Sequence, residues 1–178
     1  MWIYILIGVI VLLLIYVLVV YNKFIRLNNM VNEAFSTMDV YLKKRWDLIP
    51  NIVEVVKGYA AHEKSLFEEI TKLRTAYMEN KSLSDASVLD GKLNSLIAVA
   101  ESYPELKASD NFLNLQKNLT KMEDQLQAAR RLYNTDVTTY NTALQTFPSN
   151  MIAGLFGFKA EELFQLEPGK EGPVKVEL

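Results

Sequence analysis

The chain has 178 residues, of which 50% are hydrophobic and 22% charged, and its formal net charge is −2. This length suits one domain with an appended segment, and the near-neutral charge gives no reason to expect nucleic acid as a partner. The chain has no cysteine, which excludes disulfides, thiolate nucleophiles and cysteine-ligated metals. Its one histidine, His62, disfavours zinc hydrolases and di-iron bundles, which need several imidazoles. We therefore expect no cofactor and no metal.

The first predicted element is a transmembrane anchor over residues 1–22. From Trp2 to Tyr21 the sequence has no charge, and such a run spans roughly 30 Å as a helix, about the hydrocarbon thickness of a bilayer. A cleaved signal peptide is disfavoured, because no basic residue follows Met1 and no small-x-small cleavage site follows the apolar run. The anchor residues that we single out, including the aromatic rings near its ends, are Trp2, Tyr4, Leu12, Leu13, Leu14, Tyr16 and Tyr21.

The basic residues predict the orientation of this anchor. All 19 Lys and Arg residues follow Tyr21, beginning with Lys23 and Arg26. Because basic residues favour the cytoplasmic side of a span, we expect the N-terminus outside the cell and the rest of the chain in the cytoplasm.

Residues 23–147 are predicted to form an antiparallel helical bundle. Few glycines and prolines interrupt this region, which favours long helices. Apolar residues recur at alternating intervals of three and four, and a helix with such a face is stable when it packs on other helices. The predicted fold class is therefore all-α, an N-terminal transmembrane helix followed by about four helices with coiled-coil-like packing.

The helix boundaries follow from capping residues and prolines. Asp47 is expected to cap a second helix that runs to about residue 79, because its carboxylate can accept from the free amides of the first turn. Residues 80–84 are expected to form the turn after that helix, and Pro104 is expected to end the third helix. Ser109 or Asp110 is expected to cap the fourth helix, and Pro148 to end it.

The fourth helix is predicted to be longer than the third. At 1.5 Å per residue, residues 109–147 span close to 60 Å and residues 83–103 about half of that. One end of the fourth helix must therefore overhang its neighbour, and its apolar stripe continues there. Either the first two helices cover this stripe alone, or another protomer or the membrane covers it. The candidate contacts on the stripe are Tyr140, Leu144 and Phe147.

The densest basic cluster is formed by Lys43, Lys44 and Arg45. A solvated helix end is the first interpretation, because cations near a helix C-terminus interact favourably with the helix dipole and Asp39 stands four residues before Lys43. The alternative is a tip that binds a partner.

Apolar residues crowd into a short hydrophobic or amphipathic segment over residues 148–166. Its spacing of Gly154, Gly157 and Lys159 does not fit a phosphate loop. A helix that caps the bundle core, burial in the membrane interface and a contact between subunits are the alternatives. The candidate contacts are Met151, Ile152, Leu155, Phe156 and Phe158. Residues 167–178 are predicted to be a flexible tail.

Two blocks of the sequence resemble the LemA family of bacterial membrane proteins. The first, from Asp39 to Glu63, reads DVYLKKRWDLIPNIVEVVKGYAAHE. The second, from about Tyr103 to Lys159, contains YPELKASDNF, AARRLYNTDVTTYNTALQTFPSN and AGLFGFK. The resemblance covers essentially the whole chain and implies a single-pass protein of the bacterial cell membrane with a long helical-bundle body. It carries over no active-site residues, because the family is not defined by an accepted catalytic activity.

The leading functional hypothesis is a non-enzymatic, membrane-anchored scaffold that self-associates into homo-oligomers and organises or shapes the bacterial inner membrane. The alternative is an adaptor for another membrane protein, such as a quality-control protease or a signalling kinase. A hydrolase is the weakest hypothesis, because the sequence lacks a nucleophile–base constellation, a metal-ligand set and a phosphate loop. The expected partners are the lipid bilayer and further copies of the chain, with another membrane protein under the alternative.

Overall fold

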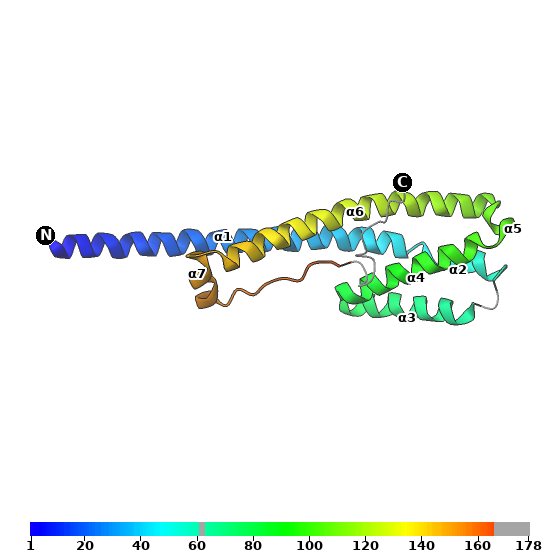
Figure 1. Cartoon of the computed structure of the whole chain (residues 1–178), viewed down its shortest axis with the longest axis horizontal. Coiled ribbons are helices and arrows are strands. Elements are labelled where there is room, and N and C mark those ends of the chain that lie inside the picture. Colours follow the sequence, from blue (N-terminus) through cyan, green and yellow to red (C-terminus); the bar gives the residue numbers. More distant parts are fainter. Residues whose placement is uncertain (61–62, 166–178) are drawn as a thin grey trace, which may run out of the picture. The chain divides into compact units, whose positions relative to one another are not determined.

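The structure, a computed structural model, describes residues 1–60 and 63–165. The predicted all-α class is confirmed, and the described part of the chain contains seven helices (Figure 1). They are α1 (Trp2–Trp46), α2 (Ile49–Lys57), α3 (Lys64–Asn80), α4 (Leu83–Glu101), α5 (Pro104–Lys107), α6 (Asp110–Gln145) and α7 (Ser149–Phe156). His62 and the predicted tail over residues 167–178 lie outside the described residues.

The single second helix predicted after Asp47 is wrong, because two helices, α2 and α3, occupy that stretch. Beyond the end of α2, the N–H groups of Tyr59 and Ala60 both donate to the carbonyl of Val56 and close the helix. Ala60 is buried, and α3 then begins after Glu63. Glu63 stands between Tyr59 and Leu66 at the position where spacing of three and four calls for an apolar residue, so the break falls where the apolar pattern fails.

The predicted cap at Asp47 is also wrong, whereas the cap at Ser109 is confirmed. Leu48 occupies the N-cap position of α2, and Asp47 Oδ1 instead accepts a hydrogen bond of 2.9 Å from Arg74 Nη2. Before α6, Ser109 Oγ accepts from the N–H of Phe112 at 3.3 Å, which satisfies one of the free amides of the first turn.

The chain divides into two compact units. Unit 1 comprises Met1–Met38 and Ala129–Leu163, and unit 2 comprises Asp39–Ala128 and Phe164–Leu178, the latter described as far as residue 165. Helices α1 and α6 each contribute to both units.

The core of unit 1 lies between antiparallel stretches of α1 and α6. The ring of Phe24 lies 6.4 Å from that of Tyr140, and the ring of Phe35 lies 6.0 Å from that of Tyr133, so residue numbers rise along one helix as they fall along the other. The buried apolar residues of the two helices in this unit are Val20, Phe24, Val31, Ala34 and Met38 with Ala129, Tyr133, Val137, Tyr140 and Ala143, and Arg130 of α6 is also buried.

The overhanging stripe of α6 is covered within the chain as far as Ala143, whereas Phe147 at its end is 75% exposed. Helix α1 covers part of it, and the irregular segment 157–163 covers more. The Tyr133 hydroxyl donates to the Glu162 carbonyl at 2.7 Å, and Asn141 exchanges two hydrogen bonds of 2.8 and 3.0 Å with the backbone of Glu161. The alternative that the first two helices alone cover this stripe is wrong, because residues 157–163 contact it and Phe147 stays exposed.

In unit 2, α3 packs against α4, and the Trp46 ring at the end of α1 lies edge-on to Tyr77, with 4.4 Å between centroids. Ser82 Oγ caps α4 by accepting from the Asp85 N–H at 3.3 Å. Helices α4, α2 and α3 each bury a set of apolar residues. These residues are Leu89, Leu93, Leu96 and Ala100 with Ile49, Ile52, Val56, Phe67, Ile70 and Tyr77.

Candidate functional site

The N-terminal part of α1 presents apolar side chains in every direction. By length and composition this helix can cross a membrane. The predicted anchor residues Trp2, Tyr4, Leu12, Leu13 and Leu14 are all exposed, as is Tyr16, whereas Tyr21 is half-buried. A helix that is apolar on all sides and unburied by its own chain is suited to hydrocarbon as its solvent.

Helix α7 folds back onto the end of this apolar stretch. Gly157 ends the helix in the left-handed conformation, with φ of 74°, and the Phe158 N–H then donates to the Ala153 carbonyl at 3.0 Å. The turn brings the Phe158 ring to 5.0 Å from Phe24 and 5.7 Å from Tyr21. Each such aromatic pair contributes about 0.5–1.5 kcal/mol beyond its burial, so α7 is held beside Tyr21.

One face of α7 is buried and the other is open. Ile152 and Ala153 are buried. On the open face, Met151 and Leu155, four residues apart, are 68% and 76% exposed, and Phe147, just before the helix, is 75% exposed. Burying one such side chain fully is worth about 1.5–3 kcal/mol, so this apolar stripe is a substantial unused contact surface.

The predicted contact residues at this end of unit 1 therefore separate into two sets. Tyr140 and Ile152 are buried, and Leu144 and Phe158 are half-buried, so these four hold unit 1 together. The available side chains are those of Phe147, Met151, Leu155 and Phe156.

Burial raises the pKa of the Tyr133 and Tyr140 hydroxyls, and the negative charge of Glu161 adds to both shifts, so both tyrosines are neutral at physiological pH.

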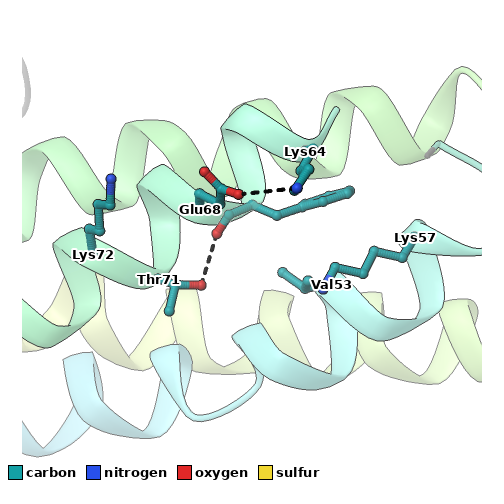
Figure 2. A pocket seen from close by; sticks show the side chains of 7 residues that line it. Val53, Lys57, Lys64, Glu68, Thr71 and Lys72 are labelled. Atoms are coloured by element: carbon teal, nitrogen blue, oxygen red, sulfur yellow. Dashed lines mark hydrogen bonds and ion pairs between the residues drawn. The ribbon is translucent and has the colours of Figure 1, made fainter. Parts of the chain in front are cut away.

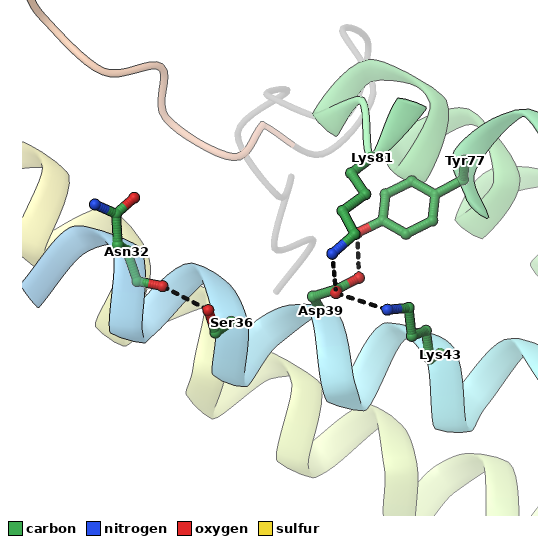
Figure 3. Close-up of polar contacts among 6 residues, drawn as sticks. All are labelled: Asn32, Ser36, Asp39, Lys43, Tyr77 and Lys81. Atoms are coloured by element: carbon green, nitrogen blue, oxygen red, sulfur yellow. Dashed lines mark hydrogen bonds and ion pairs between the residues drawn. The ribbon is translucent and has the colours of Figure 1, made fainter. Parts of the chain in front are cut away.

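Asp39 is the centre of a polar cluster in unit 2 (Figure 3). Its Oδ2 lies 2.9 Å from Lys43 Nζ and 3.1 Å from Lys81 Nζ, and its Oδ1 accepts from the Tyr77 hydroxyl at 3.0 Å. Burial alone would raise the pKa of Asp39, but the hydrogen bonds from Lys43, Lys81 and Tyr77 outweigh it, and the pKa is lowered. Burial, with the Asp39 carboxylate nearby, raises the pKa of Tyr77. The predicted pair of Asp39 with Lys43 is confirmed.

A second charged cluster surrounds Arg45. Arg45 Nη1 lies 2.6 Å from Asp90 Oδ1 and 2.6 Å from Glu123 Oε2, and Nη2 donates to Asn94 Oδ1 at 3.1 Å. The side chains of Arg45 and Asp90 are only 5% and 4% exposed. Burial lowers the pKa of the Arg45 guanidinium, and the charge of Glu123 opposes that shift.

The three residues of the predicted basic tip thus have three different environments. Lys44 is exposed, Lys43 is paired with Asp39, and Arg45 is buried and paired, so they do not form one charged surface. The expectation of a solvated cluster is wrong for Arg45, because two carboxylates from α4 and α6 compensate its charge. Sequence reasoning missed Asp90, although its position between the apolar residues Leu89 and Leu93 marks an acidic side chain next to a buried stripe.

A groove with basic residues along it lies between α2 and α3 (Figure 2). It has a volume of about 580 Å³ and is lined by Val53, Lys57, Lys64, Phe67, Glu68, Thr71 and Lys72. A second hollow of about 470 Å³ shares Val53, Lys57 and Thr71 with it and extends the groove to Arg74. The Lys57 Nζ lies 5.8 Å from the centroid of the Phe67 ring. The groove therefore combines an apolar floor with a mainly cationic rim.

Within residues 1–60 and 63–165, no three His, Cys, Asp or Glu side chains are grouped so that they could hold a metal ion. The buried carboxylates of Asp39 and Asp90 are neutralised by basic side chains and hydrogen bonds. The arrangement of these groups stabilises the fold and offers apolar and cationic surfaces for binding.

Comparison with known proteins agrees with these features. The LemA family model matches residues 34–178. Among curated proteins, Magnetosome protein MamQ 2 of Paramagnetospirillum magneticum is 28% identical over 184 residues, which cover 86% of this chain and 68% of the relative. MamQ of Magnetospirillum gryphiswaldense is 26% identical with the same coverage. Protein LemA of Metamycoplasma hominis is 28% identical over 154 residues, which cover 81% of this chain and 68% of the relative. These relatives and the apolar N-terminal helix fit a membrane-anchored protein.

Proposed function

The chain belongs to the LemA family, and we propose that it is a non-enzymatic, membrane-anchored helical scaffold that self-associates and organises the bacterial inner membrane around it. The observation that carries this proposal is the continuity of α1 from Trp2 to Trp46. The apolar stretch passes without a break into the residues that build the core of unit 1, among them Val20, Phe24 and Val31. The anchor is therefore part of the fold, whereas a cleaved leader is normally separate from the domain that follows it.

The orientation that we propose has the N-terminus outside and both units in the cytoplasm. Lys23 and Arg26, the first basic residues after the apolar stretch, are exposed on α1 and favour the cytoplasmic side. Because the chain has no cysteine, single cysteines introduced at Lys44 and at Thr139 give an unambiguous map. We expect membrane-impermeant maleimide to label them only after the cells are opened, and labelling in intact cells contradicts this orientation.

Self-association is the second part of the proposal. Copies held in one membrane have a high effective concentration, so weak contacts between them suffice. In unit 1, α1 and α6 leave Met30 and Leu132 exposed, and we assign the contact between copies to these side chains. Leu113, also on α6 and similarly exposed, belongs to unit 2 and provides a matched control.

Sedimentation of the full-length protein in detergent tests this contact. We expect oligomers that dissociate when Leu132→Ser is combined with Met30→Ser, and that persist in Leu113→Ser. If the unaltered protein sediments as a monomer at all concentrations, self-association is wrong. If Leu113→Ser has the larger effect, the contact lies elsewhere.

The groove between α2 and α3 favours a second candidate function, an adaptor for another membrane protein such as a quality-control protease or a signalling kinase. Lys57, Lys64 and Lys72 line the groove beside Phe67, which suits an acidic segment with apolar side chains. We expect the double reversal Lys57→Glu and Lys72→Glu to remove a co-purifying membrane partner, while Lys121→Glu, on α6, retains it. A partner that is retained by the double variant argues against this function.

A further inference from the structure

We infer that α7 is a second membrane contact, whose exposed side chains Met151 and Leu155, together with Phe147 before the helix, are buried in the headgroup and acyl boundary of the bilayer that α1 crosses. This inference rests on the proposed anchoring of α1. It goes further, because it assigns the open face of α7 to lipid and not to a second copy of the chain.

The position of α7 in unit 1 is the first argument. The apolar run of α1 ends at Tyr21, and the rings of Phe156 and Phe158 lie 4.9 and 5.7 Å from the Tyr21 ring. Tyrosine at the end of a span is typically at the level of the headgroups. Helix α7 is therefore held at the depth where interfacial helices lie, about 5–10 Å into the headgroup boundary.

The composition of α7 is the second argument. The helix reads SNMIAGLF and has no charged residue. Ile152 and Ala153 face the protein, so the opposite side, with Met151 and Leu155, needs another apolar environment. Lipid is present at this level around every copy, whereas a protein partner would have to be recruited to it.

The charges near α7 are the third argument. Lys23 and Arg26 are exposed within two turns of Tyr21, and Lys159 is exposed just after α7, which suits the anionic headgroups of a membrane surface. Glu161 and Glu162 are exposed on the following segment and reduce the net positive charge. Apolar burial, more than headgroup charge, is therefore expected to hold α7 in the interface.

Depth-dependent quenching tests the inference on the full-length protein. Single cysteines at Leu155, Leu132 and Val11 carry an environment-sensitive fluorophore, and the protein is reconstituted in phosphatidylcholine vesicles with and without 30% phosphatidylglycerol, at about one protein per vesicle. A nitroxide on the lipid acyl chain is the quencher. Leu132 is the matched control, because it is an exposed leucine of unit 1 on α6, about 20 Å along that helix from its C-terminal end.

We expect quenching at Leu155 to exceed that at Leu132 by at least threefold and to change by less than twofold when phosphatidylglycerol is omitted. Equal quenching at the two leucines overturns the inference, and so does quenching at Leu155 that requires phosphatidylglycerol. If the Leu155 label is unquenched at one protein per vesicle but becomes shielded at high protein density, a second copy covers α7. The Val11 label separates the two proposals. If the label at Val11 is quenched and the label at Leu155 is not, only the role of α7 is contradicted. If the label at Val11 is not quenched, the anchor itself is contradicted.

Discussion

Unit 2 buries two clusters of paired charges, whereas unit 1, which also buries Arg130, leaves a set of large apolar side chains exposed. Arg45 is buried between Asp90 and Glu123, and Asp39 accepts from three donors. In unit 1, by contrast, Phe147, Met151 and Leu155 are exposed beside a long apolar helix. Buried and paired charges stabilise the fold of the chain itself, whereas exposed apolar side chains are stabilised by contact with lipid or with another protein. The contrast fits the proposal that unit 1 contacts the membrane.

The largest expected effect is on the buried cluster of unit 2. Arg45→Met removes the cation 2.6 Å from the buried Asp90 carboxylate, so we expect the free energy of unfolding to fall by about 3–5 kcal/mol. Lys44→Met, at the exposed neighbouring position, is the control and should change it by less than about 0.5 kcal/mol. Urea titration of the full-length protein in detergent, followed by circular dichroism, measures both. An equal decrease in the free energy of unfolding in the two variants would show that the buried Arg45 contributes no more stability than the exposed Lys44.

The Asp39 cluster is expected to have the next largest effect and a distinct pH dependence. Asp39→Asn removes a charge that satisfies two lysines and a tyrosine, at a cost of about 1–3 kcal/mol. Because the folded-state pKa of Asp39 is lowered, its contribution is complete above the ordinary carboxyl pKa of about 4 and is lost as the pH falls through the folded value.

Unfolding of the wild type and of Asp39→Asn between pH 7 and pH 3 measures this dependence. The difference in their free energies of unfolding should be constant near neutral pH and should shrink below about pH 4. If the difference between the two free energies of unfolding grows as the pH falls, the pKa of Asp39 is not lowered in the folded protein.

In unit 1, two glycines of similar exposure are expected to respond in opposite directions. Gly157→Ala places a side chain at a φ of 74°, which costs about 1–2 kcal/mol. Gly154→Ala lies within α7, where an added Cβ meets nothing within 4 Å, and should stabilise the helix by about 0.5–1 kcal/mol. Hydrogen exchange over residues 149–163 should speed up in the first variant and slow down in the second. Similar exchange in both would argue that the turn at Gly157 does not hold α7 in place.

The smallest expected effects distinguish the two predicted caps. Ser109→Ala removes a hydrogen bond to a free amide of α6 and should cost about 1 kcal/mol. Asp47→Ala removes only an exposed ion pair with Arg74 and should cost less than about 0.5 kcal/mol. The same urea titrations compare the two, and a larger loss at Asp47 would indicate that it caps α2 after all.

The sequence was sufficient for the parts of the fold that depend on local patterns. The apolar run to Tyr21, the buried stripe from Leu89 to Ala100 and the pair of Asp39 with Lys43 follow from spacing along one helix. Proline and serine positions also placed the ends of α4 and the start of α6 near where they lie.

The parts that could not be predicted depend on residues far apart in the chain. The burial of Arg45 requires carboxylates on α4 and α6, and no spacing rule connects them. The segment 157–163 covers the stripe of α6 through backbone contacts with Tyr133 and Asn141, which leave no periodic pattern in the sequence. The open face of α7 could be suspected from its composition, but its place beside Tyr21 depends on the turn at Gly157.

The mass of the protein in washed membranes is the most direct measurement of whether α1 is a permanent anchor on which unit 1 is built. Membranes from cells that express the chain are washed with alkaline carbonate, and the retained protein is analysed by intact-mass spectrometry. We predict that the 20.3 kDa chain remains in the membrane fraction. A shorter species that lacks the residues before Tyr21 and is recovered in the soluble fraction contradicts the account.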